Sequence, residues 1–162
     1  MPNRLIKASL AACFGIVLAS SVALAADNWI GTWKLNTARS KFAPGPGPQS
    51  QTLKWEATPQ GIKQTSDTVD ADGTASHGGY VTRFDGKEVA WEGNPNADKA
   101  NPKKIDDNLF VNAWTLAGKP TITAKVRVSK DGKTLTVSQT GRNAKGETVH
   151  SIRDAEYLAF PR

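Results

Sequence analysis

The sequence predicts an all-β protein whose antiparallel strands form a sandwich or a barrel. Glycine-containing turn signals recur at short intervals, and the segments between them are rich in β-branched and aromatic residues. An Asp-Gly pair supplies the positive φ that tight hairpin turns require. Many short strands at such spacing are typical of sandwiches and barrels. The turn signals are Asp72-Gly73, Asp85-Gly86, Asp131-Gly132 and Lys145-Gly146.

Ten segments are strand candidates, and several of them alternate between apolar and polar residues. In the segment 120–129, apolar residues occupy the even positions from Ile122 to Val128, and polar residues occupy the odd positions from Thr121 to Arg127. A period of two indicates a strand with one buried and one solvated face. The candidates are 29–36, 50–57, 61–69, 76–85, 87–92, 99–105, 108–116, 120–129, 133–141 and 147–159.

The segments between these candidates show no helical period. Thr37 to Phe42 could form a single helical turn, since Ser and Thr can cap one. The run Ala43 to Pro48 alternates proline with glycine, and proline fixes φ and removes a hydrogen-bond donor, so we expect a surface connection there. Asn94 to Asp98 is expected to be a second loop. No internal repeat suggests a propeller or a solenoid.

The first 25 residues have the pattern of a signal peptide. Arg4 and Lys7 form a positively charged start, an apolar run extends from Ala8 to about Ala19, and Ala23-Leu24-Ala25 matches an A-x-A cleavage site. We therefore predict cleavage before Ala26 and a periplasmic or secreted protein. Residues 1–25 would be the signal peptide and residues 26–162 a single β domain.

Two other interpretations of this N-terminus are weaker. A membrane anchor needs about 20 apolar residues, which is longer than this run, and no second apolar run follows. Leu10 to Cys13 resembles a lipoprotein processing box, but most of the apolar run lies after Cys13, whereas a signal needs its apolar segment before the cut. We therefore expect no stable membrane anchor after processing.

The composition of residues 26–162 bounds what this part of the chain can do. The first 25 residues contain Cys13, the one cysteine, together with two of the 21 basic residues and none of the 15 acidic residues. The remaining 137 residues therefore carry a net charge of +4 and must be stable without disulfides. That length is enough for one domain with its own core. The basic residues are scattered without interleaved aromatic residues, so we expect no nucleic-acid partner.

The segment Asn28 to Asn36, with the sequence Asn-Trp-Ile-Gly-Thr-Trp-Lys-Leu-Asn, resembles the first strand of the calycins, which include the lipocalins and the fatty-acid-binding proteins. Ser129 to Val137 is similar to their late hairpins. The same features also resemble a set of exported bacterial lipocalin-like proteins. The resemblance covers about fifteen residues closely and the rest in strand rhythm. It implies an antiparallel, up-and-down barrel of about 8–10 strands that is closed on itself and encloses a ligand cavity.

The resemblance also implies roles for particular residues. Gly31 and Trp33 would be structural, with Trp33 closing one end of the barrel. Fatty-acid-binding proteins carry a pocket Arg-x-Tyr on their last strand, and here Arg153 and Tyr157 lie four residues apart on one face. In the lipocalin arrangement a late arginine packs across the first-strand tryptophan, and Arg153 is the candidate. The helical lid of the fatty-acid-binding proteins has no counterpart, because the Pro-Gly run occupies its place.

The aromatic residues of the middle strands are candidates for lining a pocket, although they could equally fill an ordinary core, since small barrels often have solid interiors. An arginine inside the barrel could bind an anionic headgroup through two parallel hydrogen bonds. We therefore expect a non-enzymatic barrel for a small apolar or amphipathic ligand. The alternative is a filled barrel that acts through its outer surface as an envelope interaction or inhibitor module. The candidate ligand residues are Trp55, Tyr80, Trp91, Phe110, Trp114, Arg127, Arg153 and Tyr157.

Catalysis and metal binding have little support in the sequence. His77 and His150 are the two histidines, whereas even a catalytic zinc site needs three protein ligands, so no metal or other cofactor is expected. No Gly-x-Ser-x-Gly motif or phosphate-binding loop occurs. An enzyme that uses a histidine with a distant carboxylate, such as His77 with Asp106, is a third and weaker hypothesis. Asp70-x-Asp72-Gly73 lacks the other ligands of a calcium loop and is better explained by a hairpin turn.

Overall fold

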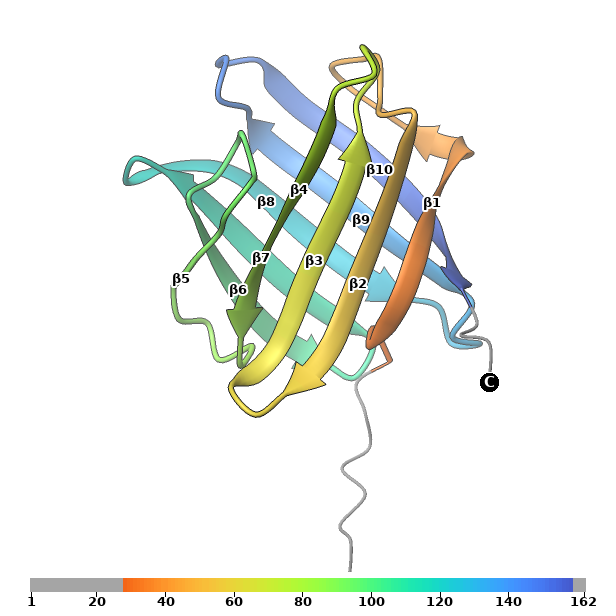
Figure 1. The fold of residues 1–162 in the computed structure, drawn as a ribbon, viewed down its shortest axis with the longest axis vertical. Coiled ribbons are helices and arrows are strands. Elements are labelled where there is room, and N and C mark those ends of the chain that lie inside the picture. The colour runs from red at the N-terminus through yellow and green to blue at the C-terminus, as the bar shows by residue number, and fades with distance from the viewer. Residues whose placement is uncertain (1–27, 159–162) are drawn as a thin grey trace, which may run out of the picture.

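The protein is an up-and-down antiparallel β-barrel, described for residues 28–158 by a computed structural model (Figure 1). None of these residues belongs to an apolar helix long enough to cross a membrane. The signal peptide expected in residues 1–25 lies outside the described residues. The strands are β1 (Gly31–Lys41), β2 (Ser50–Thr58), β3 (Gly61–Val69), β4 (Ala75–Thr82), β5 (Val89–Ala90), β6 (Lys99–Asp106), β7 (Leu109–Leu116), β8 (Lys119–Val128), β9 (Thr134–Arg142) and β10 (Thr148–Leu158).

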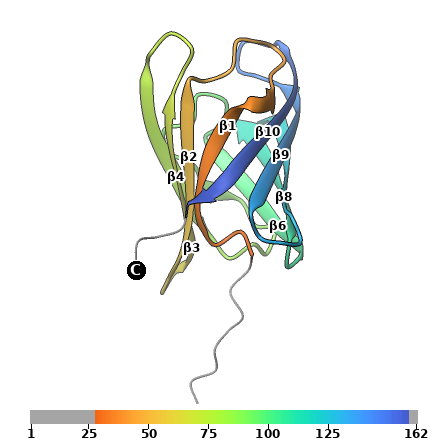
Figure 2. The ribbon, with the colours of Figure 1, turned by 90° about the vertical axis from the view of Figure 1, so that its right-hand side faces the viewer.

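The sheet has the order β4-β3-β2-β1-β10-β9-β8-β7-β6-β5. Strands that follow one another in the chain are paired, apart from β4 and β5, and two places need a separate description. One is the pairing of β1 with β10, the first and last strands, which lie side by side in Figure 2. The other is the seam between β4 and the segment that contains β5. There Gly79 and Glu92 exchange two backbone hydrogen bonds of 3.0 and 3.1 Å. The barrel is therefore nearly closed, whereas the calycin resemblance implied a barrel closed on itself.

Glycine makes this seam possible. A Cβ atom on Gly78 would overlap the backbone carbonyl of Glu92, and one on Gly93 would overlap the carbonyl of His77. Gly93 also has a φ of 72°, which favours glycine. At the other end of the seam, the amide of Lys104 donates to the carbonyl of Phe84 at 3.0 Å. The two ends of the sheet thus meet through backbone hydrogen bonds, because the glycines at the seam place no side chain between them.

Three of the predicted elements differ from the structure. The predicted strand 76–85 is shorter, because β4 ends at Thr82 and Phe84 has a φ of 55°, which is not an extended conformation. Thr37 to Phe42 does not form a helical turn, because β1 continues to Lys41, which pairs with Ile152 of β10 across a register irregularity. Ser40 Oγ accepts a hydrogen bond from the amide of Asp154, and this contact keeps the segment on the sheet. The predicted strand 87–92 shrinks to the two residues of β5, since this part of the chain pairs with β6 only through Val89 and Ala90.

The strand faces alternate as the sequence predicted. In β8, Ile122, Ala124, Val126 and Val128 are buried, and the residues between them are exposed or partly exposed. In a barrel the buried face of each strand points to the interior. The inward-facing residues of all strands therefore meet in one central space, and what fills that space decides what the barrel can hold.

Candidate functional site

The two ends of the barrel are built differently. The end that carries the turns at 59–60, 107–108 and 129–133 is closed by packed aromatic rings. Trp29 lies 5.4 Å from Phe84 and 5.2 Å from Phe110, measured between ring centroids. Trp33 is fully buried, and its indole Nε1 donates to the carbonyl oxygen of Trp29 at 2.9 Å. Side chains thus fill this end of the barrel.

The opposite end holds a cavity of about 280 Å³. The connections 42–49 and 93–96 border it, together with Asp70 and Asn143. Pro44, Pro46 and Pro48 of the predicted Pro-Gly connection lie on this border. Strand residues from β2, β3, β4, β7, β8, β9 and β10 form the walls. The proline-rich connection is therefore part of a candidate binding site as well as a link between β1 and β2.

Aromatic side chains form one part of the cavity wall. Trp91 lies between Tyr80 and Trp114, with ring centroids 4.9 Å away on each side and the rings close to perpendicular. Trp55 packs edge-on against Phe110 at 6.0 Å. Edge-to-face packing of this kind fixes the orientation of each ring. The wall therefore presents rigid apolar surface to anything inside the barrel.

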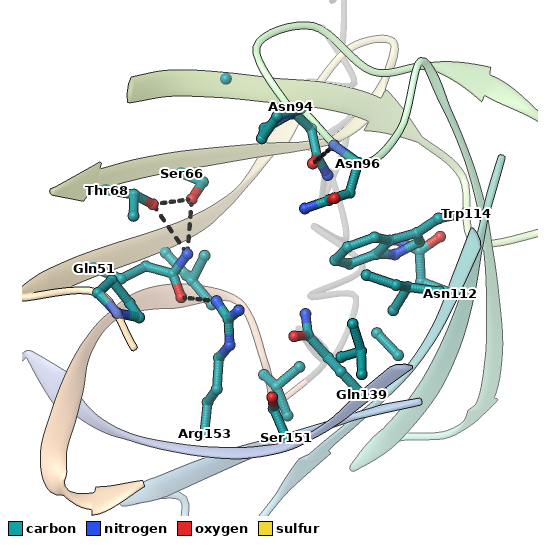
Figure 3. Close-up of a pocket in the computed structure, with 18 of the residues that line it drawn as sticks. Gln51, Ser66, Thr68, Asn94, Asn96, Asn112, Trp114, Gln139, Ser151 and Arg153 are labelled. Atoms are coloured by element: carbon teal, nitrogen blue, oxygen red, sulfur yellow. Dashed lines mark hydrogen bonds between the residues drawn. The ribbon is translucent and has the colours of Figure 1, made fainter. Parts of the chain in front are cut away.

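A cationic side chain, Arg153 of β10, forms another part of the wall. Its Nη1 donates to Oε1 of Gln51 at 3.1 Å, and the Gln51 amide in turn donates to Thr68 Oγ1 at 3.0 Å and to Ser66 Oγ at 3.4 Å (Figure 3). The guanidinium lies 5.6 Å from the ring centre of Phe42. Among residues 28–158 its side-chain hydrogen bond goes to a neutral amide and to no carboxylate.

The environment of Arg153 affects its protonation. Burial lowers the pKa of Arg153 to about 10, and the negative charge of Asp70 partly opposes this effect. The guanidinium therefore stays protonated at neutral pH. Burial also raises the pKa of the Tyr80 phenol, which consequently stays neutral there. At neutral pH the cavity wall thus carries a partly buried cation that can bind an anionic group.

A row of polar side chains crosses the interior at the level of the cavity. Strand register places Gln64 of β3 opposite Tyr80 of β4, and Gln139 of β9 opposite Ser151 of β10. Asn112 of β7 joins the row, since its Nδ2 donates to Tyr80 Oη at 3.4 Å and its Oδ1 accepts from the amide of Asn101 at 3.0 Å. Gln64, Asn112, Gln139 and Ser151 are 3 to 6% exposed. These residues give the cavity a polar part beside its aromatic wall.

Six of the eight predicted ligand residues line this cavity. They come from four strands and from the segment after β5, and the fold brings them together around one space. Leu116, which shares the parity of Phe110 and Trp114, is not part of the lining. The six residues are Trp55, Tyr80, Trp91, Phe110, Trp114 and Arg153.

The other two predicted ligand residues lie elsewhere. Arg127 is exposed on the outer face of β8, because it has the opposite parity to the buried Val126 and Val128. Tyr157 lies at the closed end, where its ring packs edge-on against Trp33 at 5.2 Å. It therefore takes the position across Trp33 that the lipocalin arrangement assigned to Arg153. A Cβ atom on Gly31 would overlap this tyrosine ring, so Gly31 leaves room for the Trp33–Tyr157 contact.

The sequence interpretation missed the polar half of the site. Gln51, Gln64, Asn112, Gln139 and Ser151 were not candidates, although each lies on an inward-facing position of its strand. The signal that could have found them is strand alternation, because every second residue of a barrel strand points inward. Asn112 lies midway between Phe110 and Trp114, and Gln139 continues the parity of Leu135 and Val137. A polar residue at an inward position of a small barrel needs either a partner or a ligand.

The histidine–carboxylate pair given as an example for an enzyme, His77 with Asp106, does not form. His77 Nδ1 lies 2.6 Å from Asp67 Oδ1, so its partner is Asp67 and not Asp106. Both side chains are about two-thirds exposed, and both have outward parity on β3 and β4. The pair lies on the outer surface and does not line the cavity. The Asp70–Gly73 segment forms the expected turn, in which Asp72 Oδ1 accepts from the amide of Thr74 at 2.9 Å.

Comparison of the chain with protein-family profiles and with curated protein sequences found no match. Comparison with solved structures found, among others, the crystal structure of zebrafish ileal bile acid-binding protein in complex with cholic acid. The match covers 81% of this chain and 99% of that protein, at 11% sequence identity and a TM-score of 0.47. The up-and-down barrel seen here is the architecture that the calycin resemblance implied.

Proposed function

We propose that this chain is an exported, non-enzymatic binding barrel that holds a small amphipathic acid. The observation that carries the proposal is the cavity at the open end, where Arg153 lies without a carboxylate partner beside an aromatic wall. Asp70 at the border of the cavity favours the charge of Arg153 through space, but the side-chain hydrogen bond of Arg153 goes to Gln51. A partly desolvated cation without a hydrogen-bonded counter-ion costs free energy. A bound carboxylate would supply the missing charge.

The size of the cavity limits the ligand. A volume of about 280 Å³ is near the lower end of the roughly 300–1,000 Å³ that small-molecule sites occupy. One water molecule takes about 30 Å³ of liquid, so the enclosed space corresponds to on the order of ten non-hydrogen atoms. A short or aromatic acid would fit inside, whereas a long alkyl chain would extend out of the open end.

The alternative function, a filled barrel that acts through its outer surface, requires side chains throughout the interior. Side chains fill the closed end, but the open end keeps a cavity lined by a partly buried cation and several buried amides. Of the exposed large apolar residues in the range 28–158, Val81 lies on β4, Ile105 lies on β6, and the other three lie on β10: Ile152, Tyr157 and Leu158. Isolated exposed residues of this kind are normal on a soluble surface and do not indicate a docking site.

Binding can be tested with two ligands of equal size, 3-phenylpropionate and its neutral alcohol, 3-phenylpropanol. Isothermal titration calorimetry gives each dissociation constant, and the quenching of tryptophan fluorescence reports contact with the aromatic wall. We expect saturable, micromolar binding of the acid and binding of the alcohol that is at least about tenfold weaker, since a charge-assisted hydrogen bond contributes about 1.5–3 kcal/mol. Saturable binding of neither compound would contradict the proposal.

Export is the other part of the proposal, supported by the charged start, apolar run and cleavage signal of residues 1–25. Expression of the full chain in a bacterial host, followed by fractionation and N-terminal sequencing, tests it. We expect a soluble protein outside the cytoplasm that begins at Ala26. A protein that begins at a lipid-modified Cys13 would instead be anchored to the membrane.

A further inference from the structure

The polar row across the interior carries hydrogen-bonding capacity that the protein itself does not use. Gln139 is 5% exposed, lines the cavity, and makes no side-chain hydrogen bond to any other residue in the range 28–158. Its amide can offer two donor hydrogens and one acceptor oxygen. Figure 3 shows this amide directed into the space between Arg153 on one side and Trp114 on the other.

Two further amides in the same row are only partly satisfied. Oε1 of Gln64 is buried and has no hydrogen-bond partner. Asn112 uses its oxygen and one amide hydrogen, on Asn101 and Tyr80, which leaves its second amide hydrogen unused. Nearly all buried polar groups in native proteins are hydrogen-bonded, so a cluster of unsatisfied amides around one cavity needs an explanation.

An alkyl chain cannot provide that explanation. If a fatty-acid tail filled the cavity, it would exclude water from the amide of Gln139 and offer it no hydrogen bond, which costs free energy. A ligand with its own hydroxyl or amide group would satisfy it. Sites built to bind a hydroxyl discriminate strongly against analogues that lack it, because the buried protein groups are then left unpaired.

From this arrangement we propose that the ligand is a small organic acid with a second, neutral hydrogen-bonding group, a hydroxyl or an amide, which binds to Gln139. The proposal rests on the binding function proposed above and narrows its ligand class. The carboxylate meets Arg153, the ring or short chain lies against Trp91 and Trp114, and the second polar group replaces the partner that the Gln139 amide lacks. A simple fatty acid is then a poor ligand for this barrel.

The test compares 3-phenylpropionate with three monohydroxylated derivatives, which carry the hydroxyl at the para, meta or α position. Octanoate serves as the alkyl acid of similar size. The protein used is the chain from Ala26 onwards, and isothermal titration calorimetry gives the dissociation constants. We expect at least one hydroxylated acid to bind about tenfold or more tightly than the parent acid, and octanoate to bind no more tightly than the parent.

Variants of Gln139 assign this preference to its side chain. Gln139→Met keeps the length of the side chain but removes its donors and acceptor, and should reduce the hydroxyl preference, the ratio of the dissociation constants of the parent and hydroxylated acids, to less than about threefold. Gln139→Leu is the second variant if Met folds poorly. Gln60→Leu, in the exposed turn between β2 and β3, is the matched control and should change neither affinity.

The outcomes separate this proposal from the function on which it depends. Equal binding of the parent and all hydroxylated acids, or a preference that persists in Gln139→Met, overturns the inference but leaves the binding barrel in place. Tighter binding of octanoate than of every hydroxylated acid also overturns it. Failure of all five acids to bind would overturn the proposed function itself. Because the Gln139 amide has no protein partner, the melting temperature of Gln139→Met should not fall.

Discussion

The closed and open ends of the barrel are made from the same ten strands but differ in how far side chains fill the interior. At the closed end, Trp29, Phe84 and Phe110 pack against one another and Trp33 is fully buried. At the open end, a similar number of aromatic residues stops short of filling the interior and leaves space beside Arg153 and the buried amides. The closed end therefore stabilises the fold through packing, whereas the open end has less packing and forms the candidate binding site.

The largest effect is expected from removing the aromatic packing at the closed end. Replacing a buried aromatic residue by alanine typically costs about 3–5 kcal/mol, against a total stability of about 5–15 kcal/mol for a domain. Trp33→Ala should therefore lower the urea midpoint severely, whereas the neighbouring exposed Lys34→Ala should change it little. Equal, small shifts in both variants would show that Trp33 does not close the barrel.

A smaller loss of stability is expected at the seam between β4 and Glu92. A methyl group on Gly78 would overlap the Glu92 carbonyl, and forced overpacking costs about 1–3 kcal/mol. Gly118→Ala is the control, since its added methyl group meets open space and carries only the strain of its positive φ, about 1 kcal/mol or more. Thermal unfolding of both variants measures the difference. A Gly118→Ala loss as large as that of Gly78→Ala would argue against a tightly closed seam.

At the open end, a substitution should affect binding and leave stability intact. Arg153→Leu removes a partly buried cation whose side-chain hydrogen bond goes to a neutral amide, so the melting temperature should stay the same or rise. The affinity for 3-phenylpropionate should fall about tenfold or more, because the charge-assisted hydrogen bond is lost. Arg127→Leu makes the same chemical change on the outer face and should alter neither property. A similar loss of affinity in both variants would place the acid outside the cavity.

The smallest effect is a pH dependence that appears only in alkaline solution. The acid ligand is ionised above about pH 6, and Arg153 stays protonated until the pH approaches its pKa of about 10. Affinity should therefore be constant between about pH 6 and 9 and weaken above about pH 10, as the guanidinium loses its proton. Calorimetric titrations over this range, with circular dichroism as a check on folding, measure the profile. A decline centred near neutral pH would implicate a different group.

The fold was largely predictable because strand formation here follows local rules. The boundaries of β2, β3, β7, β8 and β9 lie within about one residue of those predicted, since each strand alternates cleanly and ends at a turn. The end of β1 was predicted wrongly because its pairing with β10, including the contact between Ser40 and Asp154, joins residues that are more than a hundred positions apart. Such long-range contacts leave no local signal.

The site was predictable on its aromatic side and less so on its polar side. Phe110 and Trp114 lie an even number of residues apart on one strand, so both were expected to point inward, and both line the cavity. The same alternation places Arg127 outside, so that error came from selecting residues by chemistry without applying their parity. The role of Tyr157 depends on how the chain meets Trp33 at the closed end, which only the three-dimensional packing reveals.

The most direct test of the binding site uses the five tryptophan indole groups as reporters. A two-dimensional proton–nitrogen NMR spectrum of the labelled protein shows one indole signal for each tryptophan, and 3-phenylpropionate is added in steps. We predict saturable shifts for Trp55, Trp91 and Trp114, which line the cavity, and nearly unchanged signals for Trp29 and Trp33 at the closed end. Shifts confined to Trp29 and Trp33, or no shift in any indole signal at saturating ligand, would contradict a binding site at the open end of the barrel.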